Sequence, residues 1–365
     1  MNTQSPSIHP QFKLNGLAIS SAEELLNFAD SLTKEGTDFE ISVGRFLEQW
    51  LNFDPAITLT TSGSTGAPKT IELFKEAMVH SAQATGSYFK LGAGTRALLC
   101  LSADYIAGKM MLVRAMTLGW DLHIVAPAKD SLVEYDNDYD FVAMVPYQVY
   151  HSIEALDKVK KLIIGGGVVS AELEDRLQSK QTEVFATYGM TETISHVAVR
   201  RLNGFARTEV YSALPGIQFE TDQRGCLVIH APKLNPNPVV TNDLVQLESG
   251  VAFKWMGRLD NVVNSGGHKL IPEVIEAKIS DLISGRFIIA AEPDPLLGER
   301  LILVLERNPG DPTPDINRVF QVLDPYERPK KIYSASRFPM TATQKIKRDR
   351  LLEYIREGRA GSSMD

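Results

Sequence analysis

Residues Leu59–Thr70 read LTTSGSTGAPKT, a short run dominated by small, hydroxyl-bearing and glycine residues. Hydroxyls and unencumbered backbone N–H groups are what an anionic polyphosphate needs, and a lysine adds positive charge. The expected phosphate contacts are Thr61, Ser62, Gly63, Ser64, Thr65, Gly66 and Lys69. The Walker A loop of P-loop NTPases is excluded, because Pro68 stands where that pattern requires its second glycine. For this stretch taken alone, a flexible solvated linker is the alternative.

The whole-chain composition is typical of a soluble globular enzyme. The 365 residues suffice for two or three domains, and the net charge of −7 gives no reason to expect nucleic-acid binding. Cys100 and Cys226 each lie in an apolar run, so we expect buried, reduced thiols rather than a disulfide or a nucleophile. The first residues lack the apolar segment of a signal peptide, and no run approaches the length of a membrane span. We therefore expect a cytoplasmic protein without membrane contact.

Short apolar runs between residues 97 and 188 indicate an α/β fold class. Runs of this length without polar alternation are typical of strands buried on both faces, and hence of a parallel sheet. The expected strands are Ala97–Leu101, Leu122–Ala126, Phe141–Val145, Leu162–Ile164 and Val184–Thr187. The expected helices are Lys109–Leu118, Pro146–Ala155, Ala171–Gln178 and an earlier one within SSAEELLNFADSL, which begins at Ser20.

The pattern changes near Leu214, where Gly/Pro turns alternate with short strands and predict a small antiparallel β unit. After Gly257 we expect one helix, two strands and a basic tail, at Pro272–Ile283, Phe287–Ala291, Leu301–Leu305 and residues 345–359. The expected division is a large domain over residues 1–257 and a smaller α+β domain over residues 258–365.

Five stretches resemble, in the right order, the signature motifs of adenylate-forming enzymes. This is the superfamily of acyl-CoA synthetases, peptide-synthetase adenylation domains and luciferases. The stretches are TSGSTGAPK at 61–69, IIGGGVVS at 163–170, YGMTET at 188–193, TNDL at 241–244 with GRLDNVVNSGGHKLIPEVIE at 257–276, and PMTATQKIKR at 339–348. The resemblance implies the fold of that superfamily and its reaction, in which a carboxylate joins the α-phosphate of ATP and pyrophosphate leaves.

The resemblance assigns the phosphate chemistry to a few residues. The loop at 60–69 would hold the β- and γ-phosphates, and Thr191 would contact the α-phosphate. Glu192 would ligate Mg²⁺, a cation that takes carboxylate and phosphate oxygens. Lys345 would be the catalytic lysine that bridges the carboxylate and α-phosphate oxygens, although Gln344 stands where the superfamily has glycine. Each residue taken singly could instead be a solvated charge or a turn residue.

The residues that the resemblance implies in nucleoside binding are Gly165, Gly166, Gly167, Tyr188, Gly189, Asp243 and Arg258. The ring of Tyr188 would stack on adenine, and the three consecutive glycines would leave room for the base. Asp243 would accept hydrogen bonds from the ribose hydroxyls, and Arg258 would help to hold the ribose or a phosphate. Taken one at a time, a core tyrosine, a turn aspartate and a plain glycine turn are the alternatives.

In this superfamily the C-terminal domain is a mobile lid that rotates between two half-reactions. Asp260, in GRLDN, matches the hinge position. One orientation would deliver Lys345 for adenylation, and the other would open a path for a thiol to attack the acyl-adenylate. The pair Gly266 and Gly267 would let a pantetheine arm pass close to the backbone. A turn aspartate and an ordinary β-turn are the alternatives.

Two local matches concern the acid. YIAGK (Tyr105–Lys109) and YGMTETISH resemble the o-succinylbenzoate–CoA ligases of menaquinone biosynthesis, which implies a small carboxylic acid, ATP, Mg²⁺ and CoA as partners. The acid pocket would draw on Tyr105, Gly108, Lys109, Met190 and His196. Lys109 and His196 are the candidates for a cation facing a second carboxylate. An exposed lysine and a hydrogen-bonded histidine are the alternatives.

About 59 residues precede the phosphate loop, where most members of the superfamily carry well over 100. We therefore expect an N-terminally shortened large domain, in which a homodimer partner could complete the acid pocket. Two other functions stay open at this point. One is an adenylating enzyme that loads its acid onto a carrier protein, and the other is a non-catalytic nucleotide-binding protein.

Overall fold

The computed structural model describes residues 7–61, 69–308, 310–341, 346–358 and 361–362. Within these residues the largest sheet has thirteen strands, in the order β12-β13-β14-β15-β11-β10-β9-β8-β7-β5-β6-β1-β2. Its parallel centre consists of β5 (Arg96–Leu99), β6 (Asp121–Ile124), β7 (Tyr139–Met144), β8 (Val159–Ile164) and β9 (Glu183–Gly189). The five expected strands are thus confirmed as neighbours in one parallel sheet.

Helices cover both faces of this parallel centre. Phe141 and Ala143 of β7 share a core with α3 (Lys75–Phe89) and α4 (Ile106–Leu118). The alternate residues Val142 and Met144 pack on the opposite face. The helices of that face are α5 (Pro146–Ser152) and α6 (Ala171–Leu177). Because both faces are buried, β7 carries no polar alternation, which explains the continuous apolar runs in the sequence.

The helix boundaries differ from the expected ones by a few residues. The helix α4 begins at Ile106 rather than Lys109, after the N-cap position at Tyr105. The helix α5 ends at Ser152 and continues as a 3-10 turn over Ile153–Lys158.

Elements from the first 75 residues complete this end of the molecule. The strands β1 (Lys13–Leu14) and β2 (Leu17–Ala18) extend the sheet beside β6. The helices α1 (Ala22–Glu35) and α2 (Asp38–Leu51) pack into the core shared by α3 and α4. Ser21 caps α1, because its side chain accepts a hydrogen bond from Glu24 N at 3.1 Å. A separate hairpin joins β3 (Ala56–Thr61) to β4 (Lys69–Phe74).

Antiparallel strands extend the other edge of the parallel sheet. They are β10 (His196–Arg201), β11 (Val210–Ala213), β12 (Gln218–Thr221), β13 (Cys226–His230), β14 (Val239–Ser249) and β15 (Ala252–Arg258). The antiparallel character expected after residue 214 is confirmed. These strands do not form a sheet of their own, because β11 pairs with both β10 and β15 and so continues the parallel sheet. Turn chemistry in the sequence indicated the hairpins but not this connection.

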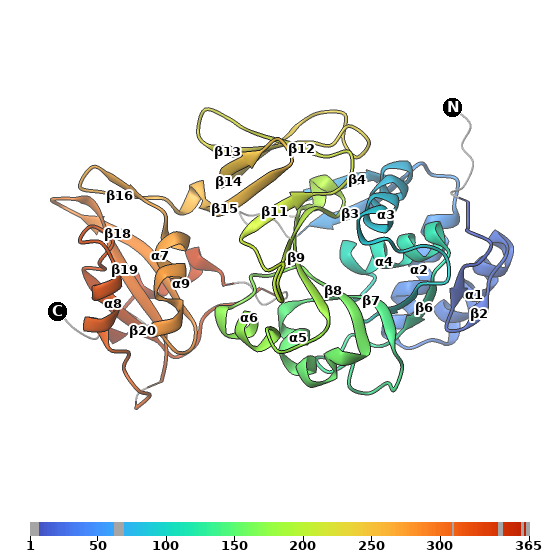
Figure 1. Cartoon of the computed structure of the whole chain (residues 1–365), viewed down its shortest axis with the longest axis horizontal. Coiled ribbons are helices and arrows are strands. Elements are labelled where there is room, and N and C mark those ends of the chain that lie inside the picture. The colour runs from blue at the N-terminus through green and yellow to red at the C-terminus, as the bar shows by residue number, and fades with distance from the viewer. Residues whose placement is uncertain (1–6, 62–68, 309, 342–345, 359–360, 363–365) are drawn as a thin grey trace.

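A second sheet follows from residue 263, and Figure 1 shows this C-terminal unit in orange and red, at the opposite end of the molecule from α1 and α2. Its strands are β16 (Val263–Ser265), β17 (His268–Leu270), β18 (Phe287–Asp294), β19 (Gly298–Glu306), β20 (Lys331–Ala335) and β21 (Gly361–Ser362). One face packs against α7 (Pro272–Ile279) and α8 (Ile316–Val322), and the other against α9 (Arg348–Arg356). This unit therefore has hydrophobic cores of its own, one on each face of its sheet.

Two smaller expectations are also settled by the structure. Cys100 and Cys226 are both buried and unbonded, and burial raises the pKa of the Cys100 thiol to about 12, so this thiol is inert at neutral pH. In the part of the chain that the structure describes, every helix is too short or too polar to cross a membrane.

Candidate active site

The carboxyl ends of the parallel strands carry the glycine turn. The strand β8 ends at Ile164, and Gly165–Gly167 follow directly. Gly166 has φ +75°, a conformation that favours glycine. A Cβ at Gly165 would lie 2.8 Å from Thr187 Oγ1 of the neighbouring strand. Ligands of open α/β sheets bind at the carboxyl ends of the strands, and the three predicted glycines lie at that edge.

Asp243 is the centre of a hydrogen-bonded group that we call the Asp243 cluster, which comprises Tyr188, Asp243, Trp255 and Arg258. The Tyr188 hydroxyl donates to Asp243 Oδ2 at 2.7 Å, and Trp255 Nε1 donates to Oδ1 at 3.3 Å. Arg258 Nη1 lies 3.8 Å from Oδ1, because Arg258 stands opposite Asp243 in the β14–β15 ladder. The structure thus brings together three residues that the sequence predicted for nucleoside binding, Tyr188, Asp243 and Arg258, and adds Trp255 to them.

Burial raises the pKa of Tyr188, and the neighbouring Asp243 carboxylate raises it further. The phenol therefore stays protonated at neutral pH and donates to Asp243. The ring itself makes edge-on contacts with Tyr211 and Phe253. A buried carboxylate that accepts two hydrogen bonds and lies beside a guanidinium is a fixed acceptor that suits the hydroxyls of a sugar.

Asp260 lies beside this cluster, in a 3-10 turn over Leu259–Asn261 between β15 and β16. Its Oδ2 accepts from Arg258 Nη2 at 2.7 Å, and its Oδ1 accepts from Asn242 Nδ2 at 3.1 Å. The residue predicted as the hinge therefore stands between the last strand of the large sheet and the first strand of the second sheet.

Thr191 and Glu192 lie in a 3-10 turn, Thr191–Thr193, directly after β9. The Glu192 side chain is exposed and Thr191 is half-buried. Among the described residues no three His, Cys, Asp or Glu side chains gather to hold a metal ion. A single exposed carboxylate suits Mg²⁺ that arrives with phosphate oxygens, because Mg²⁺ uses one or two carboxylates together with substrate phosphates and water.

The phosphate loop and the predicted catalytic lysine can be placed only at their boundaries. Thr61 and Lys69 are paired at the end of the β3–β4 ladder where the connecting segment joins the two strands. The predicted contacts between them, Ser62, Gly63, Ser64, Thr65 and Gly66, lie outside the described residues, as does Lys345. A β-bridge between Met340 and Ile346 closes the segment that contains this lysine.

A buried arginine that the sequence analysis missed lies in the region predicted to bind the acid. Arg114 of α4 is 1% exposed. Its Nη2 donates to Ser195 Oγ at 2.7 Å, and its Nε donates to Thr85 Oγ1 at 3.3 Å. Burial lowers its pKa to about 9, so the guanidinium is charged at neutral pH. No ion pair joins it to a carboxylate within the described ranges of the chain.

His196 completes this Arg114 cluster of Thr85, Arg114, Ser195 and His196. The histidine is buried, 3.4 Å from Arg114 Nη2 and 3.4 Å from Thr85 Oγ1. Burial lowers the pKa of His196 far below its usual value, and Arg114 lowers it further. The lowered pKa favours a neutral ring at pH 7, and the place of His196 in the acid pocket stays a prediction. The cation in this place is Arg114.

Lys109, the other expected cation, is buried against a different element. Its Nζ lies 4.9 Å from the ring centroid of Phe46 in α2, and burial lowers its pKa. Arg114 stands five positions after Lys109, so the two side chains point about 140° apart around α4. The structure does not bring Lys109 to His196. The sequence MMLVRAM could have pointed to Arg114, because a single arginine within an apolar helix is expected to be buried together with its apolar neighbours.

The remaining predicted acid-pocket residues, Tyr105, Gly108 and Met190, have different surroundings. Tyr105 is exposed at the start of α4, whereas Gly108 is buried where a Cβ would collide with the Ser102 carbonyl. Met190 is half-buried against the core of the parallel sheet. Gly189 has no space for a Cβ either, because the chain at Ser195 passes directly over it.

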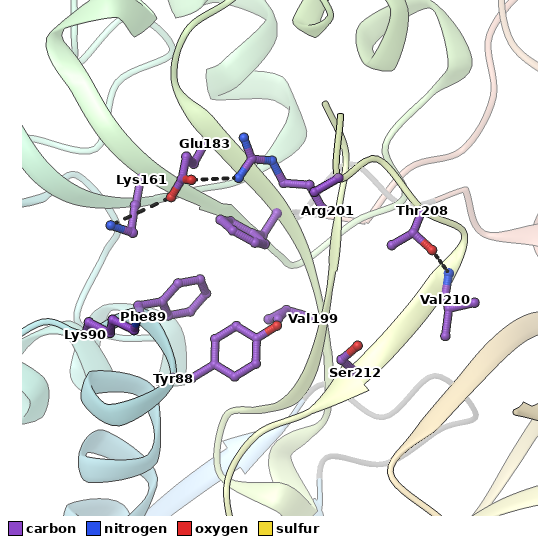
Figure 2. A pocket seen from close by; sticks show the side chains of 12 residues that line it. Tyr88, Phe89, Lys90, Lys161, Glu183, Val199, Arg201, Thr208, Val210 and Ser212 are labelled. Carbon is purple, nitrogen blue, oxygen red and sulfur yellow. Dashed lines mark hydrogen bonds and ion pairs between the residues drawn. The ribbon is translucent and has the colours of Figure 1, made fainter. Parts of the chain in front are cut away.

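A separate cavity of about 570 Å³ lies at the C-terminal end of α3, and Figure 2 shows its lining. Its floor includes Glu183 and Phe185, near the start of β9, rather than the residues from Tyr188 onward. Glu183 pairs with Lys161 at 3.7 Å and with Arg201 at 3.1 Å, as the dashed lines indicate. None of the lining residues is a predicted site residue, so this cavity is distinct from the candidate active site.

Comparisons with known proteins agree with the motif pattern. The family of AMP-binding enzymes matches residues 14–220. An acyl-CoA synthetase (AMP-forming)/AMP-acid ligase II-like protein from Dyadobacter fermentans is 38% identical, with a TM-score of 0.60 over 90% of this chain and 98% of that one. A probable 2-succinylbenzoate–CoA ligase from Mycobacterium tuberculosis is 24% identical over 94% of this chain and 96% of that protein.

Two further relatives are longer than this chain. A 2-succinylbenzoate–CoA ligase from Salmonella typhimurium is 27% identical, and the match covers 67% of this chain but 57% of that protein. The o-succinylbenzoate–CoA synthetase of Bacillus subtilis, solved in complex with ATP and magnesium ion, has a TM-score of 0.68 at 18% identity. This match covers 81% of this chain and 69% of that one, and at such identity it concerns the fold alone.

The fold and the matches together define an α/β enzyme of the adenylate-forming class. The chain belongs to the AMP-binding enzyme family, within which it is an AMP-forming acid–CoA ligase family enzyme.

Proposed function

We propose that this chain joins a dicarboxylic acid to AMP and then transfers the acyl group to the thiol of CoA. One carboxylate oxygen attacks the α-phosphorus of ATP, the bond from that phosphorus to the bridging oxygen breaks, and pyrophosphate leaves. The thiol then attacks the acyl carbon, AMP leaves with the electron pair of the broken bond, and the thiol proton passes to solvent. Bound Mg²⁺ would neutralise charge on the phosphate oxygens.

The Asp243 cluster supports binding of the nucleoside. Asp243 has oxygens fixed by Tyr188 and Trp255 and retains acceptor capacity for ribose hydroxyls. The ring of Tyr188 would lie against adenine while its hydroxyl orients Asp243. Glu192 and Thr191, on the turn that follows, would hold Mg²⁺ and the α-phosphate.

The observation that carries the choice of acid is the unpaired charge of Arg114. A buried charge without a partner costs several kcal/mol, whereas a bound counter-ion of good geometry offsets that cost. The partners of Arg114 in the described chain are neutral, and Ser195 places the cluster on the same turn as Thr191 and Glu192. We assign Arg114 to the second carboxylate of the acid, and 2-succinylbenzoate, the substrate in menaquinone biosynthesis, is our best candidate.

The C-terminal unit would act as the lid. We place the domain boundary at residues 257–258, with Asp260 as the hinge, because Asp260 lies between the two sheets and contacts Arg258 and Asn242 from the large sheet. Rotation about this turn would bring Lys345 to the α-phosphate in the first half-reaction and remove it in the second.

The acceptor is proposed to be CoA rather than a carrier protein. Gly266 and Gly267, with φ +56° and +85°, form the exposed turn between β16 and β17. Next to them, His268 and Tyr326 stack with their ring centroids 3.9 Å apart, and Tyr326 is 60% exposed. An exposed aromatic surface beside an open backbone suits a nucleobase attached to a pantetheine arm.

The experiment that tests this function is incubation with ATP, Mg²⁺, CoA and a panel of carboxylic acids, with detection of AMP and acyl-CoA by mass spectrometry. We expect AMP and a CoA thioester with 2-succinylbenzoate. Absence of AMP with every aromatic acid would refute the proposal. Acylation of a phosphopantetheine-bearing protein, but not of free CoA, would identify the carrier-loading alternative.

The lid assignment has its own test in Lys345→Ala. We expect this variant to lose acid-dependent ATP–pyrophosphate exchange but to convert supplied acyl-adenylate and CoA into thioester. An equal loss in both half-reactions would contradict the assignment of Lys345 to the first half-reaction only.

A further inference from the structure

The turn between β9 and β10 has an unusual backbone at Ile194. This residue has φ +67° and ψ −54°, and Ser195 N donates to Thr193 O at 2.7 Å. The hydrogen bond spans two residues, which defines a γ-turn, and the positive φ makes it the rarer and more strained form. Among the described non-glycine residues with positive φ, Ile194 is the only one branched at Cβ, where this conformation is least favourable.

The surroundings hold this turn in place. Thr193 is fully buried, its Oγ1 accepts from Met190 N at 3.0 Å, and its hydroxyl can donate to Met190 O at 3.0 Å or to Ser195 O at 2.9 Å. Ile194 is 2% exposed and belongs to the main core. The chain also passes so closely over Gly189 that a Cβ there would collide with the Ser195 carbonyl. Strain of this kind persists only where packing over-determines it.

The strained residue separates the two chemical ends of the candidate site. On its N-terminal side, two and three residues away, stand Glu192 and Thr191, which are proposed to meet Mg²⁺ and the α-phosphate. On its C-terminal side, Ser195 Oγ accepts the 2.7 Å hydrogen bond from Arg114. The relative position of the phosphate end and the acid end therefore depends on the backbone of the two-residue link Thr193–Ile194, in which Ile194 is the strained residue.

We propose that Ile194 is a positioning residue, whose γ-turn fixes Thr191 and Glu192 relative to the acid held by Arg114. This inference rests on the proposed function and adds a residue that does not itself touch a substrate. Attack of a carboxylate on the α-phosphorus requires close and aligned reactants, and a misplacement of about 1 Å can lower the rate on the order of 100-fold. A rigid turn prevents such displacement.

The test compares Ile194→Ala with Ile194→Gly. Both substitutions remove the side chain, but only glycine relieves the positive φ and frees the backbone. We expect Ile194→Gly to have a melting temperature equal to or above that of Ile194→Ala. In spite of this, its kcat for acid-dependent ATP–pyrophosphate exchange should be at least about tenfold lower than that of Ile194→Ala, with KM for ATP within about threefold.

Val240, an exposed β-branched residue of β14, provides the matched control pair Val240→Ala and Val240→Gly. There the backbone is extended, so glycine should melt at a lower temperature than alanine and leave kcat unchanged. A merely structural role for Ile194 would make kcat follow the melting temperature. The inference is overturned if Ile194→Gly is as active as Ile194→Ala.

A second readout separates this inference from the proposed function. Calorimetric titration with ATP, with and without Mg²⁺ and without any acid, reports how Glu192 is placed. We expect Mg²⁺ to increase the ATP affinity of Ile194→Ala more than that of Ile194→Gly. If the wild-type chain catalyses ATP–pyrophosphate exchange with none of the acids tested, the proposed function fails. The titration then decides the inference, and an equal Mg²⁺ effect in both variants overturns it.

Discussion

The Arg114 cluster and the Asp243 cluster each bury a charge, but they treat it in opposite ways. Asp243, 8% exposed, is surrounded by an indole, a phenol and a guanidinium from its own chain. Arg114, 1% exposed, contacts hydroxyls, a thioether and a histidine among the residues that the structure describes, and no carboxylate of that part of the chain pairs with it. A charged group that is paired inside the protein has a fixed position and can orient a neutral group, such as a sugar, by hydrogen bonds. A charge that is left unpaired indicates that its counter-ion comes with the substrate.

The largest expected effect comes from removing the unpaired charge. We expect Arg114→Met to lower kcat/KM for a dicarboxylic acid about 100-fold or more, since a buried hydrogen-bonded charge pair is worth about 2–5 kcal/mol when one partner is lost. The melting temperature should stay the same or rise, because the variant no longer buries an uncompensated charge. Pyrophosphate exchange and thermal unfolding of the same preparation measure both quantities.

The matched control for Arg114→Met is an acid in which a carboxamide replaces the second carboxylate. The wild-type chain and the variant should use this acid with similar, low efficiency. A variant that melts far below the wild type and keeps its preference for the dicarboxylic acid would show that Arg114 is structural.

Removing the paired charge of Asp243 should have a smaller effect, and this effect should concern ATP rather than the acid. We expect Asp243→Ala to raise KM for ATP by about 10- to 100-fold, since a hydrogen bond to a charged group is worth about 1.5–3 kcal/mol. The KM for the acid should change little. Steady-state kinetics with ATP and with 2′-deoxy-ATP check the assignment, because the variant should discriminate less between the two nucleotides than the wild type does. Equal discrimination would place the ribose elsewhere.

Removing one hydrogen-bond donor to Asp243 should change KM for ATP less than removing the Asp243 carboxylate itself. Tyr188→Phe keeps the ring but deletes the 2.7 Å hydrogen bond, and we expect KM for ATP to rise about threefold to tenfold. Tyr211→Phe is the matched control, because the Tyr211 ring contacts Tyr188 but is not bonded to Asp243. If both variants behave alike, the phenol of Tyr188 does not act through Asp243.

The smallest expected effect is on stability and concerns His196. Its folded-state pKa lies below the ordinary value of 6.5, so the unfolded chain binds the proton more readily. The stability contributed by the neutral ring is complete above pH 6.5 and is lost as the pH falls toward the folded-state pKa. Between pH 6.5 and 5.5 the wild type should lose about 1 kcal/mol more than His196→Gln. Chemical denaturation at both pH values measures this difference, and parallel curves would contradict it.

The parallel sheet could be predicted because each of its strands is a local apolar run. The continuation of that sheet through β11 could not, because pairing between strands far apart in sequence leaves no local pattern. The same limit applies to the sites. Motif order pointed to Asp243 and Tyr188, but not to the hydrogen bond between them or to the part played by Trp255.

The acid pocket shows the limit most clearly. Lys109 and His196 were chosen by residue type, and the structure places Lys109 against Phe46 and keeps His196 neutral. Arg114 lies in the same helix as Lys109 and was overlooked, because which face of a helix meets a pocket depends on tertiary packing. A single arginine in an apolar helix can therefore be used in sequence analysis to predict a binding site for an anion, when no carboxylate in the sequence is an evident partner for the arginine.

Whether Arg114 selects the substrate can be measured by acid-dependent ATP–pyrophosphate exchange, with 2-succinylbenzoate and its carboxamide analogue compared at equal concentration. We expect rapid exchange with the dicarboxylic acid and a rate about 100-fold lower with the analogue. With the analogue, Arg114→Met should lower the rate little further. Equal exchange with both acids would contradict this expectation, because the charge of Arg114 would then have no part in selecting the substrate.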